Sequence, residues 1–375
     1  MHSDPRSGPW HPHREKIEMK VPYLDLARAN TPLREKLRSA IDNCLEKSVF
    51  LRGPETEAFE HEWAEYCGQK YAVACNSGTD ALTIAAQAGE LSEVVIPANT
   101  LPLTGVGLSR AGTKVEIGEV DSEGWLNTHS KMQVPVLLYG RVPESLPAGT
   151  CLVDAAHGHG WKPPREILAA WSFYPTKSLG ALGDAGAVTT NDADIAERMR
   201  DICGRDDVMR DSRQITSRID EIQAAVLRVK LQKLDEWLEQ RQEIAKAYDK
   251  RLAPYAITMS GHSFNHIYAI RIANRDALKV NLLEQGIETK VHWASSLDQV
   301  QGPWESKSDV PNARTWCSTT LSLPMFPGLT PEEISKVCDG IERWIKNTVV
   351  MNSCSVFGAP PGNRTPDPLI KSQLL

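Results

Sequence analysis

The sequence lacks the cysteine patterns that indicate a structural metal site or a disulfide framework. Its 8 cysteines are scattered along the chain, with no Cys-x-x-Cys pair and no His/Cys cluster of zinc spacing. It also lacks a run of about 18 apolar residues, the length that a membrane-spanning helix needs. These absences predict a reduced, cytoplasmic protein with no bound metal and no membrane segment.

A basic surface is missing as well. The formal net charge is -6 at pH 7, whereas nucleic-acid binding needs a basic face, so we expect no nucleic-acid partner. No internal repeat is visible. What the sequence does hold is 375 residues, 41% of them hydrophobic, which is enough for substantial cores and about two domains.

Both ends of the chain lack the pattern of a folded element. Residues 1–19 are rich in Pro, His and charge and have no apolar core of a signal peptide, while residues 349–375 carry several Gly and Pro without a helical or strand period. We expect a disordered tail at each end, although the histidines of the first tail could bind a metal. Between the tails we expect a large domain over 20–245 and a small C-terminal domain over 246–348.

Helix and strand patterns alternate between the tails. Apolar residues at a period of about 3.6 predict helices over 31–49 and 54–66 and one long helix over 218–248. Further helices are expected at 275–285 and 331–346, and strands at 71–75, 94–96, 114–117, 135–138, 151–153, 267–272 and 289–293. The alternation predicts an α/β layered sheet followed by a smaller mixed domain.

A lone lysine lies between two turns in residues 171–186. Lys177 follows Tyr-Pro-Thr and precedes Gly180, Gly183 and Gly186. A lysine in such a bend, among aromatic and small residues, can be partly desolvated, which lowers the pKa of its amine and makes it nucleophilic toward a carbonyl. The alternative is an ordinary exposed lysine in a glycine-rich turn.

Two further segments place polar groups at the ends of predicted strands. One strand delivers Ser77, Gly78 and Thr79 to the start of a helix, where free N–H groups and the helix dipole favour an anion. An ordinary helix N-cap is the alternative there. Asp154 directly follows another strand, at the end where open α/β sheets bind ligands, and a turn aspartate is the alternative.

Pyridoxal 5′-phosphate is one cofactor that uses all three features. Its aldehyde needs an amine, its phosphate needs N–H and hydroxyl donors, and its pyridine nitrogen needs an acidic partner to stay protonated. A charge-assisted hydrogen bond from a buried Asp contributes about 1.5–3 kcal/mol, enough to keep the ring an electron sink. The lysine, the helix start and the aspartate together therefore indicate a site for this cofactor.

The motifs also resemble a known family, the DegT/StrS pyridoxal-phosphate sugar aminotransferases of the aspartate-aminotransferase fold type. The matching stretches follow one another in the family's order at residues 53–60, 76–82, 153–160, 172–180, 217–225, 286–292 and 321–327. The resemblance implies a three-layer PLP-transferase large domain with a mainly parallel mixed sheet and a smaller α+β C-terminal domain. It also implies a transaminase that moves an amino group from Glu or Gln to a keto sugar, nucleotide-linked, by a ping-pong mechanism.

Roles in the cofactor site follow from the resemblance. Lys177 is implied to be the Schiff-base lysine and to carry the catalytic proton, Asp154 to pair with the pyridine nitrogen, and His157 to lie beside the ring. The residues implied to hold the phosphate are Gly78, Thr79 and Ser172.

The resemblance further implies a homodimer with shared active sites. The family's Asn-x-Arg, which reaches the neighbouring subunit, falls on Thr216 and Arg218, and Arg218 is implied to clamp the α-carboxylate of the amino donor through a bidentate pair. His292 corresponds to a partner-chain residue near the substrate.

The sequence departs from the family pattern in three places. Thr216 stands where the family has a phosphate-binding Asn, and Leu101 stands where it has an aromatic residue stacked on the ring. The segments 89–94 and 141–150 look shorter than usual, and the second lacks most of a crossover helix. These departures predict weaker cofactor binding and leave the predicted lysine and carboxylate unchanged.

Three other functions are alternatives to the transaminase. A catalytically silent regulatory or structural homologue is allowed by the resemblance, and Thr216 and Leu101 favour it somewhat. A sugar dehydratase of the same family typically has His in place of the lysine, so Lys177 argues against that activity. A dinucleotide oxidoreductase would need Gly-x-Gly-x-x-Gly, whereas the glycines here are spaced Gly-x-x-Gly-x-x-Gly. The keto position of the sugar, 3 or 4, stays open.

Overall fold

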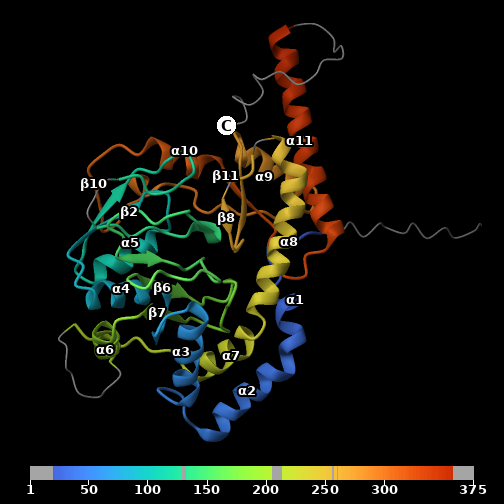
Figure 1. Ribbon diagram of the computed structural model, residues 1–375. Helices are drawn as coiled ribbons and strands as arrows, with labels where there is room; N and C mark the ends of the chain where they lie inside the picture. Colours follow the sequence, from blue (N-terminus) through green and yellow to red (C-terminus); the bar gives the residue numbers. More distant parts are fainter. Residues whose placement is uncertain (1–19, 129–131, 205–212, 256, 260, 358–375) are drawn as a thin grey trace, which may run out of the picture.

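The computed structural model describes residues 20–128, 132–204, 213–255, 257–259 and 261–357 (Figure 1). The predicted tail over 1–19 and the last part of the other tail, 358–375, lie outside the described residues. Among the helices that are described, none combines the length and the apolar character needed to cross a membrane.

Helices account for most of the regular structure. The α-helices are α1 (Leu26–Asn30), α2 (Arg34–Lys47), α3 (Pro54–Cys67), α4 (Gly78–Ala88), α5 (Pro102–Arg110), α6 (Ala193–Ile202), α7 (Glu221–Leu231), α8 (Leu234–Leu252), α9 (Arg275–Glu284), α10 (Pro311–Thr319) and α11 (Pro331–Phe357). Short 3-10 turns are η1 (Thr31–Leu33), η2 (Leu138–Gly140), η3 (Ala253–Tyr255) and η4 (Leu297–Gln299).

The strands form one mixed arrangement and two small antiparallel pairs. They are β1 (Tyr71–Cys75), β2 (Glu93–Pro97), β3 (Lys114–Gly118), β4 (Arg141–Val142), β5 (Leu152–Asp154), β6 (Leu168–Ser172), β7 (Gly186–Thr190), β8 (His262–Ser263), β9 (Tyr268–Arg271), β10 (Glu305–Ser306) and β11 (Thr320–Leu323). One sheet has the order β1-β7-β6-β5 and another the order β10-β3-β2, while β4 pairs with β8 and β9 with β11.

The two larger sheets are joined by the segment predicted as a strand at 135–138. This segment and Gln133 before it make only single parallel bridges, from Gln133 to Val95 and Thr150 and from Val136 to Asp154. Within the sheets β5, β6, β2, β3 and β10 pair in parallel, and β7 runs antiparallel to both of its neighbours. The predicted mixed α/β sheet is therefore confirmed.

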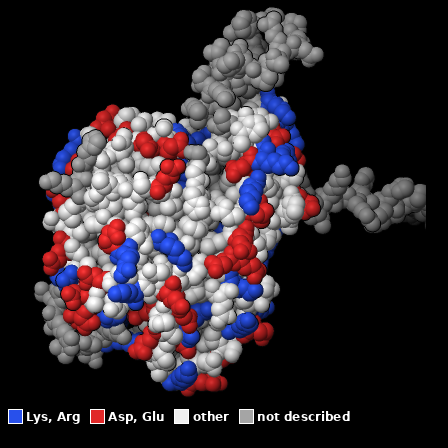
Figure 2. All heavy atoms as spheres, in the orientation of Figure 1, with Lys and Arg blue, Asp and Glu red and all other residues white. Residues whose placement is uncertain are grey.

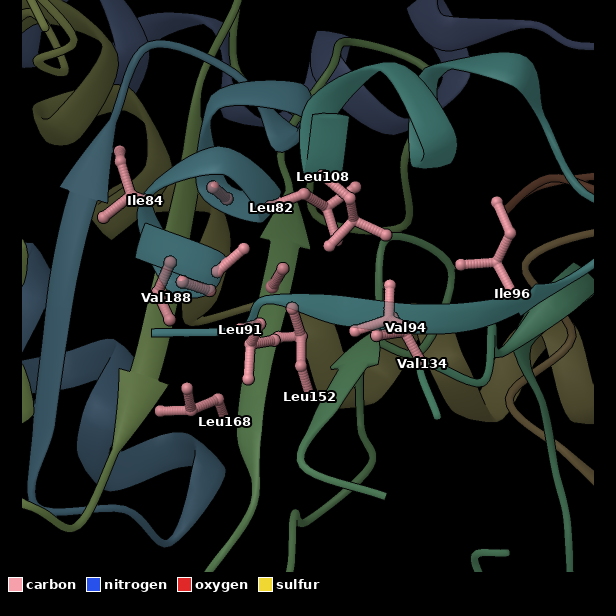
Figure 3. Packing of buried hydrophobic residues seen from close by; sticks show 14 of the residues in the cluster. Leu82, Ile84, Leu91, Val94, Ile96, Leu108, Val134, Leu152, Leu168 and Val188 are labelled. Atoms are coloured by element: carbon pink, nitrogen blue, oxygen red, sulfur yellow. The ribbon is translucent and has the colours of Figure 1, made fainter. Parts of the chain in front are cut away.

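Helices cover both faces of the sheet, because successive side chains of a strand point to opposite faces. In β1, Val73 belongs to the core under α4, α5 and α6, whereas Ala72 and Ala74 belong to the core under α3 and α7. Figure 3 shows the first core, in which Leu82 of α4 and Leu108 of α5 lie over the strand residues. The result is a three-layer arrangement.

A separate core holds the C-terminal part together. It is formed by α9 and α11 against β9 and β11, and Val21 from the start of the described chain joins it. Helix α8 contributes Leu238 to the large core and Tyr248 to this C-terminal core, and it runs between the two parts in Figure 1. The domain ranges 20–245 and 246–348 meet inside α8 and stay a prediction.

Four predicted elements are wrong in their extent. The strand expected at 135–138 makes only the single bridge from Val136 to Asp154. The helix expected over 218–248 is two helices, α7 and α8, because the backbone breaks at Gln232 and Lys233, although Leu227, Leu231, Leu234 and Leu238 keep a helical spacing across the break. The strand expected at 289–293 makes only a single bridge, and its side chains line a cavity instead. The first part of the tail expected over 349–375 is helical instead, since α11 continues to Phe357.

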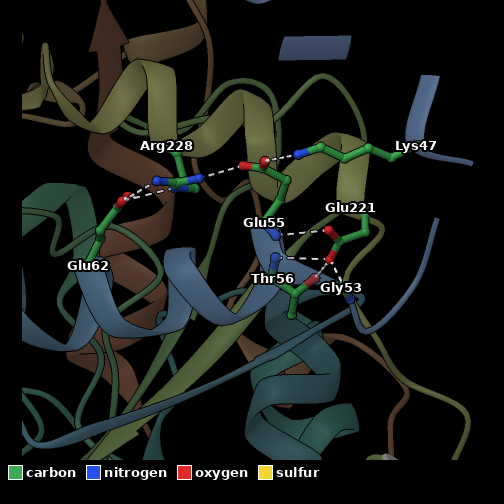
Figure 4. A network of polar contacts seen from close by, with 7 residues as sticks. All are labelled: Lys47, Gly53, Glu55, Thr56, Glu62, Glu221 and Arg228. Carbon is green, nitrogen blue, oxygen red and sulfur yellow. Dashed lines mark hydrogen bonds and ion pairs between the residues drawn. The ribbon is translucent and has the colours of Figure 1, made fainter. Parts of the chain in front are cut away.

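The packing of α3 against α7 depends on a buried carboxylate. Glu221, the first residue of α7, is 1% exposed and accepts the N–H groups of Gly53 (2.8 Å), Glu55 (2.9 Å) and Thr56 (2.9 Å) at the start of α3 (Figure 4). Further along α7, Arg228 pairs with two glutamates of α3. The first turn of α3 thus takes its cap from another helix.

We expect Glu221→Ala to lower the free energy of unfolding by about 2–4 kcal/mol, because the helix start loses a charged acceptor and keeps buried N–H groups without partners. Urea unfolding of the wild type and the variant at the same protein concentration measures this change in the free energy of unfolding. Glu236→Ala is the control, since Glu236 is 52% exposed and its contacts are a surface pair with Lys233 and a 3.4 Å hydrogen bond from Gln240. Equal midpoints for the two variants would contradict the capping role.

Candidate active site

A cavity of about 590 Å³ opens where β5 and β6 end and α4 begins. The structure brings seven of the predicted site residues together in its lining, namely Gly78, Thr79, Asp154, His157, Ser172, Lys177 and His292. Leu101, the residue expected in place of a stacking aromatic, lines it as well. The location agrees with the rule that open α/β sheets bind ligands at the carboxyl ends of their strands.

The predicted lysine lies in a tightly held turn after β6. Nδ1 of His159 accepts the N–H of Leu179 (2.9 Å), two residues beyond Lys177. Gly180 is required in this turn, because an added Cβ would lie 2.4 Å from the carbonyl oxygen of Pro175. The backbone that directly follows Lys177 is therefore held in place by the hydrogen bond to His159 and by the close contact at Gly180.

Lys177 shares the cavity with the carboxyl group of Asp154. Burial lowers the pKa of Lys177 to about 8, and the charge of Asp154 offsets part of that effect. Asp154 is 5% exposed and accepts hydrogen bonds from Oγ1 of Thr104 (2.8 Å) and the N–H of Ala156 (3.1 Å). Burial raises the pKa of Asp154, while these two hydrogen bonds and Lys177 act in the opposite direction. The site thus combines a nucleophilic amine with a carboxyl group that can pair with a protonated nitrogen.

The start of α4 forms a cradle for an anion. Ser77 caps the helix by accepting the N–H of Asp80 (3.1 Å), whereas the N–H groups of Gly78 and Thr79 have no acceptor among the described residues. An added Cβ at Gly78 would lie 2.6 Å from Cβ of Ser172, so only glycine lets the helix start lie this close to the end of β6. Free N–H groups, a hydroxyl and the helix dipole together suit a phosphate.

Two predicted histidines line the cavity in neutral form. Nδ1 of His157 accepts the N–H of Tyr139 (3.2 Å), which assigns the proton of the neutral ring to Nε2. Nδ1 of His292 lies 2.8 Å from Oγ of Ser322. Burial lowers the pKa of both rings, that of His292 to about 3. Both therefore act as hydrogen-bonding groups rather than as cations at neutral pH.

The structure places His292 in the lining of the same cavity as Lys177 of its own chain. It is held there because Lys290 forms a backbone bridge with Ser322 of β11. That His292 serves the partner chain, as the resemblance implies, stays a prediction.

Thr216 and Arg218 are not brought to this cavity. Thr216 is exposed, and Arg218 is half-buried and makes no hydrogen bond or ion pair with another described residue. Within the described part of the chain no arginine lines the cavity. Among the described residues of a single chain, the only side chains in the lining that can offer a carboxylate a positive charge at neutral pH are thus Lys177 and Lys290.

Several lining residues were missed from the sequence. Thr104 donates to Asp154, and His266, whose Nδ1 lies 3.3 Å from Oγ of Ser178, stacks near His157 with 4.5 Å between the ring centroids. Tyr23 lines the cavity from the N-terminal end of the described chain. The one available signal was the position of His266, directly before the predicted strand at 267–272.

Comparison with known proteins gives the family. The model of the DegT/DnrJ/EryC1/StrS aminotransferase family matches residues 32–136 and 150–342. The chain belongs to this family. It is 33% identical over 365 residues to dTDP-3-amino-3,4,6-trideoxy-alpha-D-glucose transaminase of Streptomyces venezuelae, which covers 87% of this chain and 96% of that protein.

A second relative and a solved structure agree. UDP-2-acetamido-2-deoxy-3-oxo-D-glucuronate aminotransferase of Pseudomonas aeruginosa is 29% identical over 353 residues, covering 85% of this chain and 98% of that protein. The crystal structure of DesV from S. venezuelae superimposes with a TM-score of 0.80 at 31% identity and covers 87% of this chain and 98% of that one. The predicted PLP-transferase fold class is confirmed, and the protein is an aminotransferase.

We expect Lys177 to react with an amine-selective acylating reagent at a lower pH than surface lysines do. With a pKa of about 8, about half of the Lys177 amines are neutral at pH 8, against under about 1% for an ordinary lysine. Competitive labelling of the cofactor-free protein across a pH series, followed by peptide mass spectrometry, gives the midpoint. Exposed Lys346 is the internal reference.

The variant Asp154→Asn should move the Lys177 midpoint to lower pH, since the charge of Asp154 raises the pKa of Lys177. A midpoint for Lys177 that matches Lys346, or that rises in the variant, would contradict the described electrostatics.

Proposed function

We propose that the protein is a pyridoxal-phosphate-dependent sugar aminotransferase that moves an amino group from Glu or Gln to a keto sugar, nucleotide-linked, by a ping-pong mechanism. The observation that carries the proposal is the meeting of Lys177, Asp154 and the Ser77–Thr79 cradle in one cavity. The free cysteines of the described residues suit the cytoplasmic location predicted from the sequence.

The residues present fit the cofactor. The close approach of Gly78 to Ser172 leaves a cradle that any side chain would fill, and the amides of Gly78 and Thr79 are free to donate to a phosphate. The buried carboxyl of Asp154 suits a ring nitrogen, and the cavity of about 590 Å³ is large enough for a cofactor and part of a substrate.

Each residue then has a chemical task. When bound, pyridoxal 5′-phosphate supplies an aldehyde that takes up amino groups and a ring that withdraws electrons from the carbon losing a proton. Lys177 would hold the cofactor through its amine, and in its neutral form that amine would accept and return the substrate proton at Nζ. Asp154 would pair with the protonated ring nitrogen, and neutral His157 would offer its Nε2–H. Gly78, Thr79 and Ser172 would hold the phosphate.

A second copy of the chain completes the site in this proposal. The cavity of one chain has no lining arginine among the described residues, whereas Arg218 lies outside it and forms no hydrogen bond or ion pair with another residue that the structure describes. Around the opening Leu103 is 47% exposed and Tyr174 51%, so a second subunit would also cover apolar surface. We assign the α-carboxylate of the donor to Arg218 of the partner subunit, with Thr216 of the partner subunit at the phosphate.

The names of the relatives favour a 3-keto sugar as acceptor. Both relatives described above are named for an amino or oxo group at carbon 3 of a nucleotide-linked sugar. The alternative remains a catalytically silent homologue of the same fold, for which Thr216 and Leu101 were the signals. Lys177 and Asp154, held as described, favour the enzyme.

We expect the purified protein with bound cofactor to change its absorbance spectrum on addition of glutamate, from the form bound to Lys177 to the pyridoxamine form. Borohydride reduction before glutamate should fix a pyridoxyl group on Lys177, located by peptide mapping. Lys290, which also lines the cavity, is the internal comparison. Labelling at Lys290 instead, or a spectrum that does not respond to any amino acid, would count against the proposal.

The shared site predicts complementation between two inactive variants. Lys177→Ala and Arg218→Ala chains should each be inactive alone, and their mixed dimer should regain activity at one site of two, because that site has both wild-type residues. Differently tagged chains, purified through both tags, give the mixed dimer. A pure mixed dimer without activity would overturn the assignment of Arg218 to the partner's cavity.

A further inference from the structure

The segment that carries Thr216 and Arg218 is anchored by the residue between them. Ser217 is 1% exposed, in contrast to both of its neighbours. Its hydroxyl donates to Oδ2 of Asp80 (2.7 Å) and accepts the N–H of Asn76 (3.1 Å). One buried hydroxyl thus uses both its donor and an acceptor position to hold this segment.

Both partners of Ser217 flank the phosphate cradle. Asn76 directly precedes Ser77, and Asp80 lies in the first turn of α4, where its own N–H donates to Oγ of Ser77 (3.1 Å). The segment is therefore fastened to the part of α4 that presents the free amides of Gly78 and Thr79. Any shift of the helix start is passed to the segment through one side chain.

The other anchors of this segment lead elsewhere. Asp220 forms a backbone bridge with Leu51, and Glu221 caps α3. Arg110 also approaches Asp80, at 3.8 Å, but its side chain is 61% exposed, so this pair restrains little. Among the side-chain contacts described, the link from Thr216 and Arg218 to the cradle is the hydroxyl of Ser217.

We propose that Ser217 is a positioning residue that ties Arg218, which this chain lends to its partner's cavity, to the phosphate cradle of its own cavity. The inference rests on the proposed function, in which Arg218 acts across the dimer. It adds that the two active sites are coupled, because the arginine that binds the donor in one site is attached through Ser217 to the phosphate cradle of the other site. Removing the hydroxyl in one chain should therefore weaken donor binding in the opposite site.

The first test uses the Ser217→Ala homodimer loaded with cofactor. Losing one buried hydrogen bond should raise the KM for glutamate about 3- to 10-fold with a smaller change in kcat. Glutarate, an unreactive dicarboxylate, should bind the same variant more weakly by a similar factor in calorimetry, a readout that does not depend on turnover. Ser217→Thr keeps the hydroxyl and should retain most of the affinity.

The matched control is Ser296→Ala. Ser296 is 0% exposed and its hydroxyl also donates to an aspartate, Asp298, but it lies outside the cavity lining. This variant should leave the KM for glutamate and the glutarate affinity unchanged. If Ser217→Ala does not fold, Asp80→Ala tests the same link, since it removes the acceptor of the Ser217 hydroxyl, and it should raise the KM in a dimer that remains folded. In a foldable Ser217→Ala background Asp80→Ala should add little, because both changes break one contact.

The decisive test separates the two sites of a mixed dimer. In a dimer of Lys177→Ala and Ser217→Ala chains, only the cavity of the Ser217→Ala chain keeps its lysine and is active. This cavity receives Arg218 from a chain with intact Ser217, so its KM for glutamate should be that of the wild type. In a dimer of a Lys177→Ala/Ser217→Ala chain with a wild-type chain, the active cavity is that of the wild-type chain. It keeps its own Ser217 but receives Arg218 from the chain that lacks Ser217. Its KM should be raised about 3- to 10-fold.

The opposite pattern is a raised KM in the first mixed dimer, whose active cavity lacks its own Ser217, and a wild-type KM in the second. It would overturn the proposal while leaving the shared active site in place. Equal, wild-type KM values in both mixed dimers would overturn it as well. Failure of the shared site itself would appear separately, as a mixed Lys177→Ala and Arg218→Ala dimer without activity.

Discussion

The structure depends on keeping an amine and a carboxyl group together out of water at the end of a sheet. Burial of Lys177 lowers the pKa of its amine to about 8, and burial of Asp154 raises the pKa of its carboxyl group, while each offsets part of the effect on the other. Neither group would have these properties on the surface. The nucleophilic amine therefore depends on a cavity that the rest of the fold must hold open and polar.

The fold meets this requirement with strand ends and one helix start. Strands β5 and β6 run in parallel, so Asp154 and Ser172 end at the same edge of the sheet. The helix α4 starts at that edge, and Gly78 lets it lie against Ser172. Helices on both faces bury the sheet, and the face that Figure 2 shows has acidic and basic side chains interspersed, so no single-sign field dominates it.

The sequence predicted the parts of the site that are local in the chain. Asp154 and the Ser77–Thr79 turn each follow a predicted strand, and that spacing places them at strand ends, whereas Lys177 was indicated by the turns around it, since the strand before it, β6, was not predicted. Contacts between distant segments could not be predicted in the same way: Thr104 reaches Asp154, and Tyr23 joins the cavity, through packing that no local period records. The break between α7 and α8 leaves no mark in the apolar spacing, since Leu231 and Leu234 pack in the same core on either side of it, and the place of His292 depends on the pairing of its segment with β11.

A crystal structure of the protein with pyridoxal 5′-phosphate and glutarate tests the central claim most directly. The account predicts a dimer in which the cofactor is joined to Nζ of Lys177, its phosphate lies on the amides of Gly78 and Thr79, and its ring nitrogen lies on Asp154. It also predicts a glutarate carboxylate bound by Arg218 of the partner subunit. A phosphate bound away from α4, or a carboxylate bound only by residues of the same chain, would contradict it.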